Sequence, residues 1–461
     1  MDGKTHEEMT SSSIGKLLLK LSIPCVLGLL LVSATSFADA IYVSRYGGSA
    51  DERTVNQGII GAYYPIVSLV QAIGYTLGIG GGCALSRFLG QSDRKRACMV
   101  LSFSINTSVI VGAVIAILGC MFPESITRVL GVKAEWMSLA KIYARLIFLS
   151  APFSAAVIAI SSLLRAEGKT VKALVGLALT GVMKLALTPI FLTRFDQVLN
   201  AVAVSNLISQ MFGSVALFLM LHCDRLGFPW NPCLSRKEGA TVLKMGVPSL
   251  FRQGTIVAST LITSRLASSL GGVYLASISV ITRIMTALSS VPIGIGQGYQ
   301  PIVGFNDGAG EHERIGIAFK VASIWGTVIV ILMSLLLVIT SDSFLPFFLN
   351  ERKMSDFSLL ALRLQLGTLP LLQYTTVVSM SYQSIGKKWS ALVLAALRQG
   401  VILLPVIYCA VYFWKGTGLA MAQPIADAIT FVLSVPFGVL FLRNMRQKTE
   451  KKRVRKVFDK H

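Results

Sequence analysis

Long apolar runs alternate with short polar connections along almost the entire chain. Twelve of these runs are close to the roughly 20 residues that an α-helix needs to cross a bilayer. The runs cover residues 17–43, 57–80, 98–122, 137–163, 171–193, 198–221, 242–268, 272–300, 316–340, 358–384, 390–413 and 418–442. The hydropathy pattern therefore predicts an all-α polytopic membrane protein with twelve transmembrane helices.

Composition and charge agree with this interpretation. Only 14% of the residues are charged, against about 25% in soluble domains. Lys and Arg collect after the second, fourth, sixth and tenth runs and after residue 442, whereas the connections 123–135 and 341–357 are nearly neutral. The positive-inside rule then places both termini in the cytoplasm, in a multi-pass protein of the plasma (inner) membrane. The net charge of +21 follows from this topology, and its scatter argues against a nucleic-acid-binding face.

An internal repeat divides the chain into two halves. Residues 19–24 (Leu-Lys-Leu-Ser-Ile-Pro) match residues 243–248 (Leu-Lys-Met-Gly-Val-Pro), and Gly78–Gly80 match Gly294–Gly296. Each half contains an even number of crossings, so we expect two six-helix lobes of the same orientation, related by a pseudo-twofold axis along the membrane normal. The predicted parts are a cytoplasmic N-terminus at 1–16, lobes at 17–222 and 241–442, a cytoplasmic loop at 223–240 and a basic cytoplasmic tail at 443–461. Two such lobes favour alternating access, and hence a transporter rather than a channel or a receptor.

Several kinds of functional site are not indicated. The seven cysteines contain no Cys-x-x-Cys pair, and the four histidines have no partners at metal-binding spacing. The glycine run Gly78–Gly82 follows no strand and precedes no Lys-Ser/Thr, so close helix packing explains it better than a phosphate-binding loop. We expect no enzymatic activity, no metal site and no cofactor.

The functional candidates are polar residues inside the spanning segments. A carboxylate there costs roughly 2.5–3.5 kcal/mol on insertion scales, and a helix this apolar does not need one to fold. Asp39 and Asp427 are the acids placed well inside predicted segments, whereas the bases there are Arg145, Lys184, Arg252, Arg283 and Arg398. The candidates for contact with a cavity or substrate are Gln71, Arg145, Arg283, Arg398, Gln399 and Asp427.

The segment Pro292–Gly310, with the sequence Pro-Ile-Gly-Ile-Gly-Gln-Gly-Tyr-Gln-Pro-Ile-Val-Gly-Phe-Asn-Asp-Gly-Ala-Gly, closely resembles a family signature. That family is the multidrug and toxic compound extrusion (MATE) transporters, in the branch typified by a staphylococcal multidrug exporter. Further matches are Ser22-Ile23-Pro24 with Asp39, Arg398-Gln399-Gly400 with Pro405, and Gln423–Asp427. The resemblance covers nearly the whole chain. It implies two six-helix lobes, a central cavity and export of substrates in exchange for inward sodium ions or protons.

The resemblance also implies a site for ion coupling. In the family, the aspartate matched by Asp39 is the coupling carboxylate, with Asn-x-x-x-Asp-Pro on helix five and a Thr on helix six. Here Lys184 and Thr188 stand at the two helix-five positions, and Ser205 matches the Thr. Asp39 and Lys184 should differ by about 7 Å in depth at 1.5 Å per residue, which a lysine stem can cover. We hypothesise that Lys184 pairs with Asp39 in place of sodium, so that either protons drive transport through this pair or the site has lost its coupling role. Alternatively, Lys184 faces the cavity and Asp39 binds protons alone.

The substrate remains open at this stage. The balance of charges suits dications poorly, so drugs, other xenobiotics or metabolites are possible cargoes, and anionic or zwitterionic metabolites are a specific alternative. A second alternative is a flippase of the same superfamily for lipid-linked precursors, because a basic cavity suits a diphosphate headgroup. We expect the protein to lie in the lipid bilayer, to transport a small organic substrate and to function as a monomer. We expect it to bind no nucleic acid.

Overall fold

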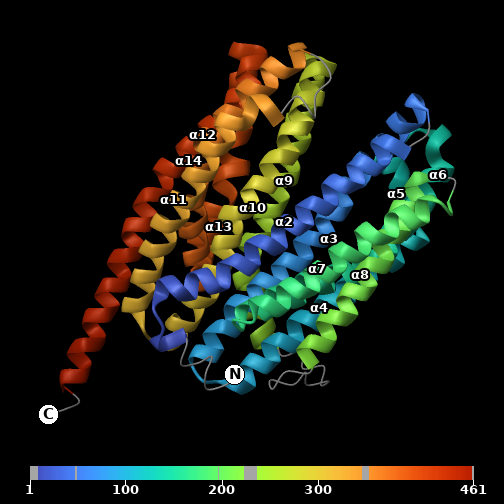
Figure 1. Ribbon diagram of the computed structural model, residues 1–461. Coiled ribbons are helices and arrows are strands. Elements are labelled where there is room, and N and C mark those ends of the chain that lie inside the picture. The colour runs from blue at the N-terminus through green and yellow to red at the C-terminus, as the bar shows by residue number, and fades with distance from the viewer. Residues whose placement is uncertain (1–8, 47–48, 196, 223–235, 345–351, 459–461) are drawn as a thin grey trace. The chain divides into compact units, whose positions relative to one another are not determined.

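The computed structural model describes residues 9–46, 49–195, 197–222, 236–344 and 352–458, in which every regular element is helical (Figure 1). The first half contains α2 (Ile14–Tyr46), α3 (Ala50–Gly90), α4 (Arg94–Met121), α5 (Pro123–Val129), η1 (Ala134–Trp136), α6 (Met137–Ala166), α7 (Thr170–Leu192) and α8 (Val198–His222). The second half contains α9 (Arg236–Leu270), α10 (Gly272–Gly308), α11 (His312–Phe344), α12 (Arg352–Ser384), α13 (Lys388–Ala396), η3 (Leu397–Ile402) and α14 (Leu403–Phe458).

The prediction of an all-α polytopic membrane protein is confirmed. Among the described residues, nine helices are long and apolar enough to cross a membrane, judged by length and composition. One of these, Lys388–Val454, contains the last two predicted segments. Helices α9 and α12, with 35 and 33 residues, are also long enough but carry more polar residues. All twelve predicted runs lie within helices to within one residue at their ends.

The last two predicted segments, 390–413 and 418–442, meet at a break within α14. Lys415 has a φ angle of 46° and interrupts the helix. A Cβ at Gly418 would lie 1.9 Å from the carbonyl oxygen of Ala410, so only glycine allows the returning helix to approach this closely. The first of the two segments is built from α13, the π-helical η3 and the start of α14.

Several helices continue beyond the predicted apolar runs. Residues 236–240, predicted as part of a loop, belong to α9, and residues 443–458 of the predicted tail extend α14. Hydropathy marks only the part of a helix that lies in hydrocarbon, whereas charged pairs such as Arg446–Glu450, at positions i and i+4, support a helix in water. Residues 1–8, 223–235 and 459–461 of the predicted terminus, loop and tail lie outside the described residues.

The chain forms two compact units. Unit 1 comprises residues 27–85 and 94–246, and unit 2 comprises residues 2–26, 86–93 and 247–461. Figure 1 shows α3, α4, α6, α7 and α8 of unit 1 as a bundle of roughly antiparallel helices. The units follow the two halves of the repeat except at helix ends: α2 starts and α3 ends in unit 2, whereas α9 starts in unit 1. The predicted lobes, 17–222 and 241–442, do not include this assignment of helix ends to the other unit.

The apolar core of each unit is continuous between helices distant in sequence. In unit 1, buried side chains of α3, α6 and α8 form one cluster, in which the Tyr63 and Tyr143 rings meet edge to face at 5.6 Å. In unit 2, Ile278 of α10 packs with Ile402 of η3 and Ala426 of α14. These clusters fix how each helix is rotated about its axis, and therefore which polar side chains face one another.

Glycines allow helices from the two halves to pack closely within each unit. In unit 2, a Cβ at Gly298 of α10 would lie 2.6 Å from the Cα of Ser22 on α2. In unit 1, a Cβ at Gly80 of α3 would lie 2.4 Å from the carbonyl oxygen of Val242 on α9. The glycine runs thus serve close helix packing, as we predicted, and the helix pairs α2–α10 and α9–α3 correspond to each other in the repeat.

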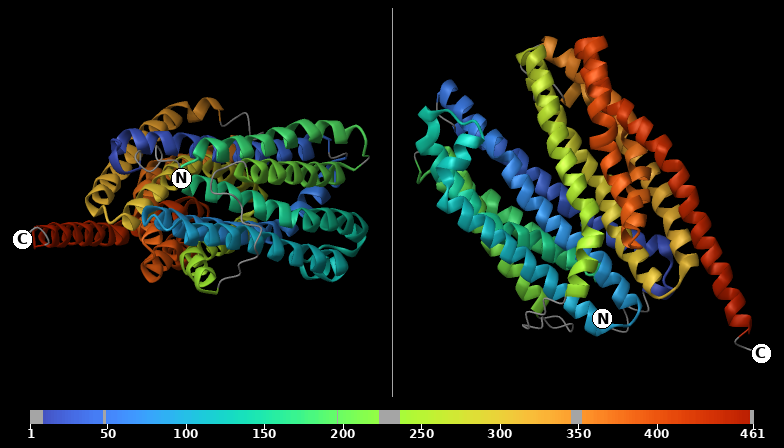
Figure 2. Two further views of the ribbon diagram at one scale, coloured as in Figure 1. Left: turned by 90° about the horizontal axis from the view of Figure 1, so that it is seen from below. Right: turned by 180° about the vertical axis from the view of Figure 1, so that it is seen from behind.

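A charged cluster lies at the end of α10 in unit 2. The Asp307 carboxylate, with only 4% of its side chain exposed, lies 3.2 Å from Nε of Arg87 and 3.7 Å from Nζ of Lys448. Further along α14, Lys452 pairs with Glu311 at 2.8 Å. These contacts hold the basic end of α14, which extends past the other helices of unit 2 (Figure 2).

We predict that Gly298→Ala lowers the melting temperature of the detergent-solubilised protein, because the new methyl group would overlap the backbone of α2. Overpacking of this kind costs about 1–3 kcal/mol. The matched control is Gly254→Ala on α9, where a Cβ meets nothing within 4 Å and the higher helix propensity of alanine should be neutral or stabilising. Equal melting temperatures for the two variants would show that the α2–α10 contact is not limited by space.

Candidate functional site

Asp39 lies in the part of α2 that belongs to unit 1. One turn earlier, α2 carries the hydroxyls of Thr35 and Ser36, and both donate to the carbonyl oxygen of Val32. These hydroxyls are therefore satisfied within their own helix, as is usual for Ser and Thr inside helices. The carboxylate of Asp39 obtains its partner from another helix.

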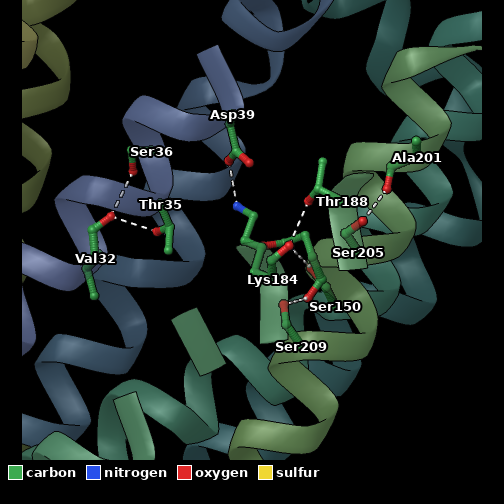
Figure 3. A network of polar contacts seen from close by, with 11 residues as sticks. Val32, Thr35, Ser36, Asp39, Ser150, Lys184, Thr188, Ala201, Ser205 and Ser209 are labelled. Carbon is green, nitrogen blue, oxygen red and sulfur yellow. Dashed lines mark hydrogen bonds and ion pairs between the residues drawn. The ribbon is translucent and has the colours of Figure 1, made fainter. Parts of the chain in front are cut away.

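That partner is Lys184 on α7. Its Nζ donates to Oδ2 of Asp39 at 2.5 Å (Figure 3). The exposed face of α7 is apolar and includes Val175, Leu179 and Val182, so the helix places its lysine on the opposite side, toward α2. The hypothesised contact between the two charges is present, and its functional role remains a prediction.

The pair is only partly shielded from solvent. The side chains of Lys184 and Asp39 are 15% and 26% exposed. Because each charge neutralises the other, the pair is far cheaper to hold inside a spanning bundle than either charge alone. Removing one partner of a buried pair typically costs about 3–5 kcal/mol, since it leaves an uncompensated charge. Oδ1 of Asp39 has no hydrogen-bond donor among the described residues, so this oxygen can still accept a proton.

The two predicted hydroxyls do not bond to the carboxylate. Thr188 Oγ1 donates to the carbonyl oxygen of Lys184 at 2.8 Å, and Ser205 Oγ donates to that of Ala201 at 2.6 Å. Both side chains are fully buried, and Figure 3 shows them beside the pair. Of the four predicted coupling residues, the structure therefore joins only Asp39 and Lys184 directly through their side chains.

A tyrosine that sequence reasoning missed also lies near Asp39. Tyr143 of α6 is within electrostatic range of this carboxylate, is 5% exposed and packs against Tyr63. Tyr63 in turn shares a hydrogen bond of 2.5 Å with Thr127 of α5. A single tyrosine in an apolar run has no pattern that distinguishes it from ordinary core packing, so the sequence offered no signal for it.

Unit 2 contains a second ion pair at membrane depth. Arg398 donates from Nε to Oδ1 of Asp427 at 2.7 Å and from Nη2 to Oδ2 at 3.3 Å. Gln423 adds a third donor to Oδ1 at 2.8 Å, and Ser259 of α9 donates to Gln399 at 2.9 Å. Arg398 and Gln399 lie in the π-helical segment η3, a geometry often found at functional sites. Three of the predicted cavity candidates therefore lie close together. Arg398 and Asp427 bind each other, and Gln399, next to Arg398 in the chain, binds Ser259.

The other three predicted candidates do not join these clusters. Gln71 on α3 is half-buried, whereas Arg145 on α6 and Arg283 on α10 are exposed. None of these three side chains has a hydrogen bond or ion pair to the described residues. Groups of three or more His, Cys, Asp or Glu that could hold a metal ion are also absent from the described part of the chain.

Comparison with protein families gives one clear match. The MatE family model matches this chain twice, at residues 24–190 and 248–409. The matches begin at Pro24 and Pro248, the prolines that correspond in the internal repeat, so each half of the chain contains one copy of the family pattern.

Relatives match over nearly the full length. "Multidrug export protein MepA" of Staphylococcus saprophyticus is 23% identical over 425 residues, which cover 91% of this chain and 92% of the relative. A structure described as the outward-facing conformation of a multidrug resistance MATE family transporter superposes with a TM-score of 0.88 at 22% identity, covering 95% and 98% of the two chains.

A Pyrococcus furiosus transporter of the MOP superfamily, described as having a binding pocket of reversed polarity, superposes with a TM-score of 0.85 at 22% identity and covers 95% of this chain and 98% of its own. These structural likenesses establish the shared fold. Together with the two family matches across both halves, they identify this chain as a member of the MatE family, the multidrug and toxic compound extrusion transporters.

Proposed function

We propose that this protein exports small organic molecules across the plasma membrane by alternating access, and that inward movement of protons drives the export. The observation that supports this proposal best is the contact between Asp39 and Lys184 in unit 1. Family membership supports transport, and the name of the staphylococcal relative supports multidrug export. The Asp39–Lys184 pair supports the choice of ion.

Sodium fits this site poorly. Hard cations in proteins are bound by several oxygen ligands, usually with net negative charge. Here a single carboxylate already contacts an ammonium, so the net charge of the pair is close to zero rather than negative. A sodium ion at Oδ1 of Asp39 would lie beside the Lys184 ammonium, and one carboxylate would then have to balance two positive charges.

A proton fits the same site well. Oδ2 of Asp39 is held by Lys184, whereas Oδ1 is open to accept a proton. Protonation removes the negative charge and leaves the Lys184 ammonium without its counter-ion in a region of low dielectric, where unpaired charges cost several kcal/mol. The protonated protein therefore favours an arrangement of α2 and α7 that gives Lys184 water. The ionised and the protonated protein thus favour different arrangements of α2 and α7, and the proton gradient drives the change between them.

We predict that a proton gradient alone drives export by the wild-type protein and that a sodium gradient alone does not. The measurement is transport of a fluorescent cation (ethidium) and a fluorescent anion (carboxyfluorescein) in proteoliposomes, with each gradient imposed separately. Sodium-driven transport that persists while the internal and external pH are clamped would contradict the proposed replacement of sodium by Lys184.

Substitution of either charge should change coupling in different ways. For Asp39→Asn we expect proton-driven transport to fall at least about tenfold, which corresponds to only about 1.4 kcal/mol, because the proton acceptor is gone. For Lys184→Asn we expect coupling to protons to weaken, because protonation of Asp39 then no longer leaves an ammonium without its counter-ion. Proton-driven transport at the wild-type level in both variants would rule out a coupling role for the pair.

The matched control is the ion pair between Glu124 of α5 and Lys141 of α6, also in unit 1 but at a helix end. The hydrogen bond from Lys141 and the charges of Lys141 and Arg128 hold the pKa of Glu124 below its ordinary value. Glu124 therefore stays ionised near neutral pH, and Glu124→Gln should leave both the ion dependence and the pH profile unchanged.

A further inference from the structure

The spanning helix α10 exposes a polar face. Ser279, Thr282, Arg283 and Thr286 are all exposed, and their spacing of three and four residues places them on one side of the helix. Val273, near the start of α10, is the only large hydrophobic residue of this helix that is exposed. The inner part of this face therefore contains no apolar surface for lipid.

The neighbouring helix α11 shows the opposite pattern. From Ile324 to Ile339 its exposed residues are all large and apolar: Ile324, Trp325, Val328, Ile329, Ile331, Leu332, Leu335, Leu336 and Ile339. This is the composition of a surface in contact with lipid chains. Hydrocarbon cannot hydrate hydroxyl groups or a guanidinium, so the polar face of α10 borders water rather than lipid.

Arg283 lies deep along this face. It is eleven residues after Gly272, where α10 begins, and eleven residues correspond to about 16 Å of helix. The predicted spanning segment covers residues 272–300, so Arg283 lies well inside it, away from both ends. At that depth, even a long arginine side chain reaches an interface only with difficulty.

Arg283 also has no acidic partner in the part of the chain that the structure describes. Asp427 of unit 2 is already neutralised by Arg398 and bonded by Gln423. The elements that carry these groups, η3 and α14, pack against α10 through Ile278. No salt bridge joins Arg283 to any described residue. The described spanning region of unit 2 thus carries an excess positive charge on a face that borders water.

We propose that Arg283 binds the anionic group of the transported molecule, and that the cargo is an organic anion or zwitterion carrying a carboxylate, sulfonate or phosphate. This inference rests on the proposed export function and names its substrate class. The planar guanidinium donates two parallel hydrogen bonds to a carboxylate or phosphate. An organic cation would instead be repelled at this position.

The hydroxyls beside Arg283 add to the selectivity. Ser279 donates to the carbonyl oxygen of Leu275, and Thr286 donates to that of Thr282. Since their protons are used within the helix, these oxygens remain as acceptors. A cargo with hydroxyl or amino donors near its anionic group therefore matches this face better than a purely anionic one.

The test measures binding and transport separately, with carboxyfluorescein and p-aminohippurate as anionic probes and ethidium as the cationic probe. We expect the purified wild-type protein to bind both anions. In Arg283→Gln, anion affinity and proton-driven anion transport should both fall at least tenfold, while ethidium transport stays the same or rises. Arg283→Lys, which keeps the charge but loses the planar fork, should recover part of the anion affinity.

The matched control is Arg363→Gln in the same unit. Arg363 pairs with Asp342 at 2.6 Å near a helix end, so its loss should not change anion affinity. Melting temperatures of all variants distinguish a binding defect from misfolding. The inference is overturned if the wild-type protein binds neither anion, or if Arg283→Gln binds them as tightly as Arg363→Gln does. Binding without gradient-driven transport would instead contradict the proposed export function and leave the anion site standing.

Discussion

Hydrocarbon hydrates neither charges nor unpaired peptide groups, and this constraint accounts for most of what the molecule contains. It explains why every regular element in the described residues is helical, since a helix satisfies its own backbone. It also explains why Asp39 and Asp427, the two acids at membrane depth, are each held by a base from another element. The same constraint makes Arg283 a candidate for ligand binding, because an exposed and unpaired guanidinium in a spanning helix requires water or an anionic ligand.

The two ion pairs are built differently. Lys184 contributes a single ammonium on a flexible stem, and it leaves one oxygen of Asp39 open. Arg398 donates one hydrogen bond to each oxygen of Asp427, and Gln423 donates a third hydrogen bond to Oδ1. A site that must gain and lose a proton benefits from the first arrangement, whereas the second uses both oxygens of its carboxylate to hold η3 and α14 together. This difference in donor geometry is why we place coupling in unit 1 and regard the Asp427 cluster as structural support.

The helix that carries Asp39 belongs to both compact units. Residues 14–26 of α2 lie in unit 2, where Ser22 contacts Gly298, and the part from Leu27 onward lies in unit 1. A change in the charge of Asp39 therefore acts on a continuous helix whose start is anchored elsewhere. Helix α9 shows the reciprocal arrangement, with its first residues packed on Gly80 of unit 1. Glycine is needed at these contacts because a single methyl group would overlap the opposing backbone.

The sequence by itself determined where the long apolar helices lie along the chain. All twelve predicted runs lie in helices, the break at Lys415 falls between the last two runs, and matching depths in the predicted segments suggested that Lys184 could reach Asp39. The family signatures in the sequence also predicted the fold. Hydropathy did not reveal the helical extensions at 236–240 and 443–458, because those residues lie outside the apolar runs and are stabilised by local backbone and charge interactions.

Only the tertiary structure decided which side chains meet. Thr188 and Ser205 donate hydrogen bonds to their own helices rather than to Asp39. Tyr143 of α6 lies within electrostatic range of the Asp39 carboxylate. Arg398, and not Arg283, forms the ion pair with Asp427. These outcomes depend on the rotation of each helix about its axis and on how closely neighbouring helices approach. Both are set by the packing of buried side chains such as Ile278 and Ala426, and hydropathy along the chain carries little information about them.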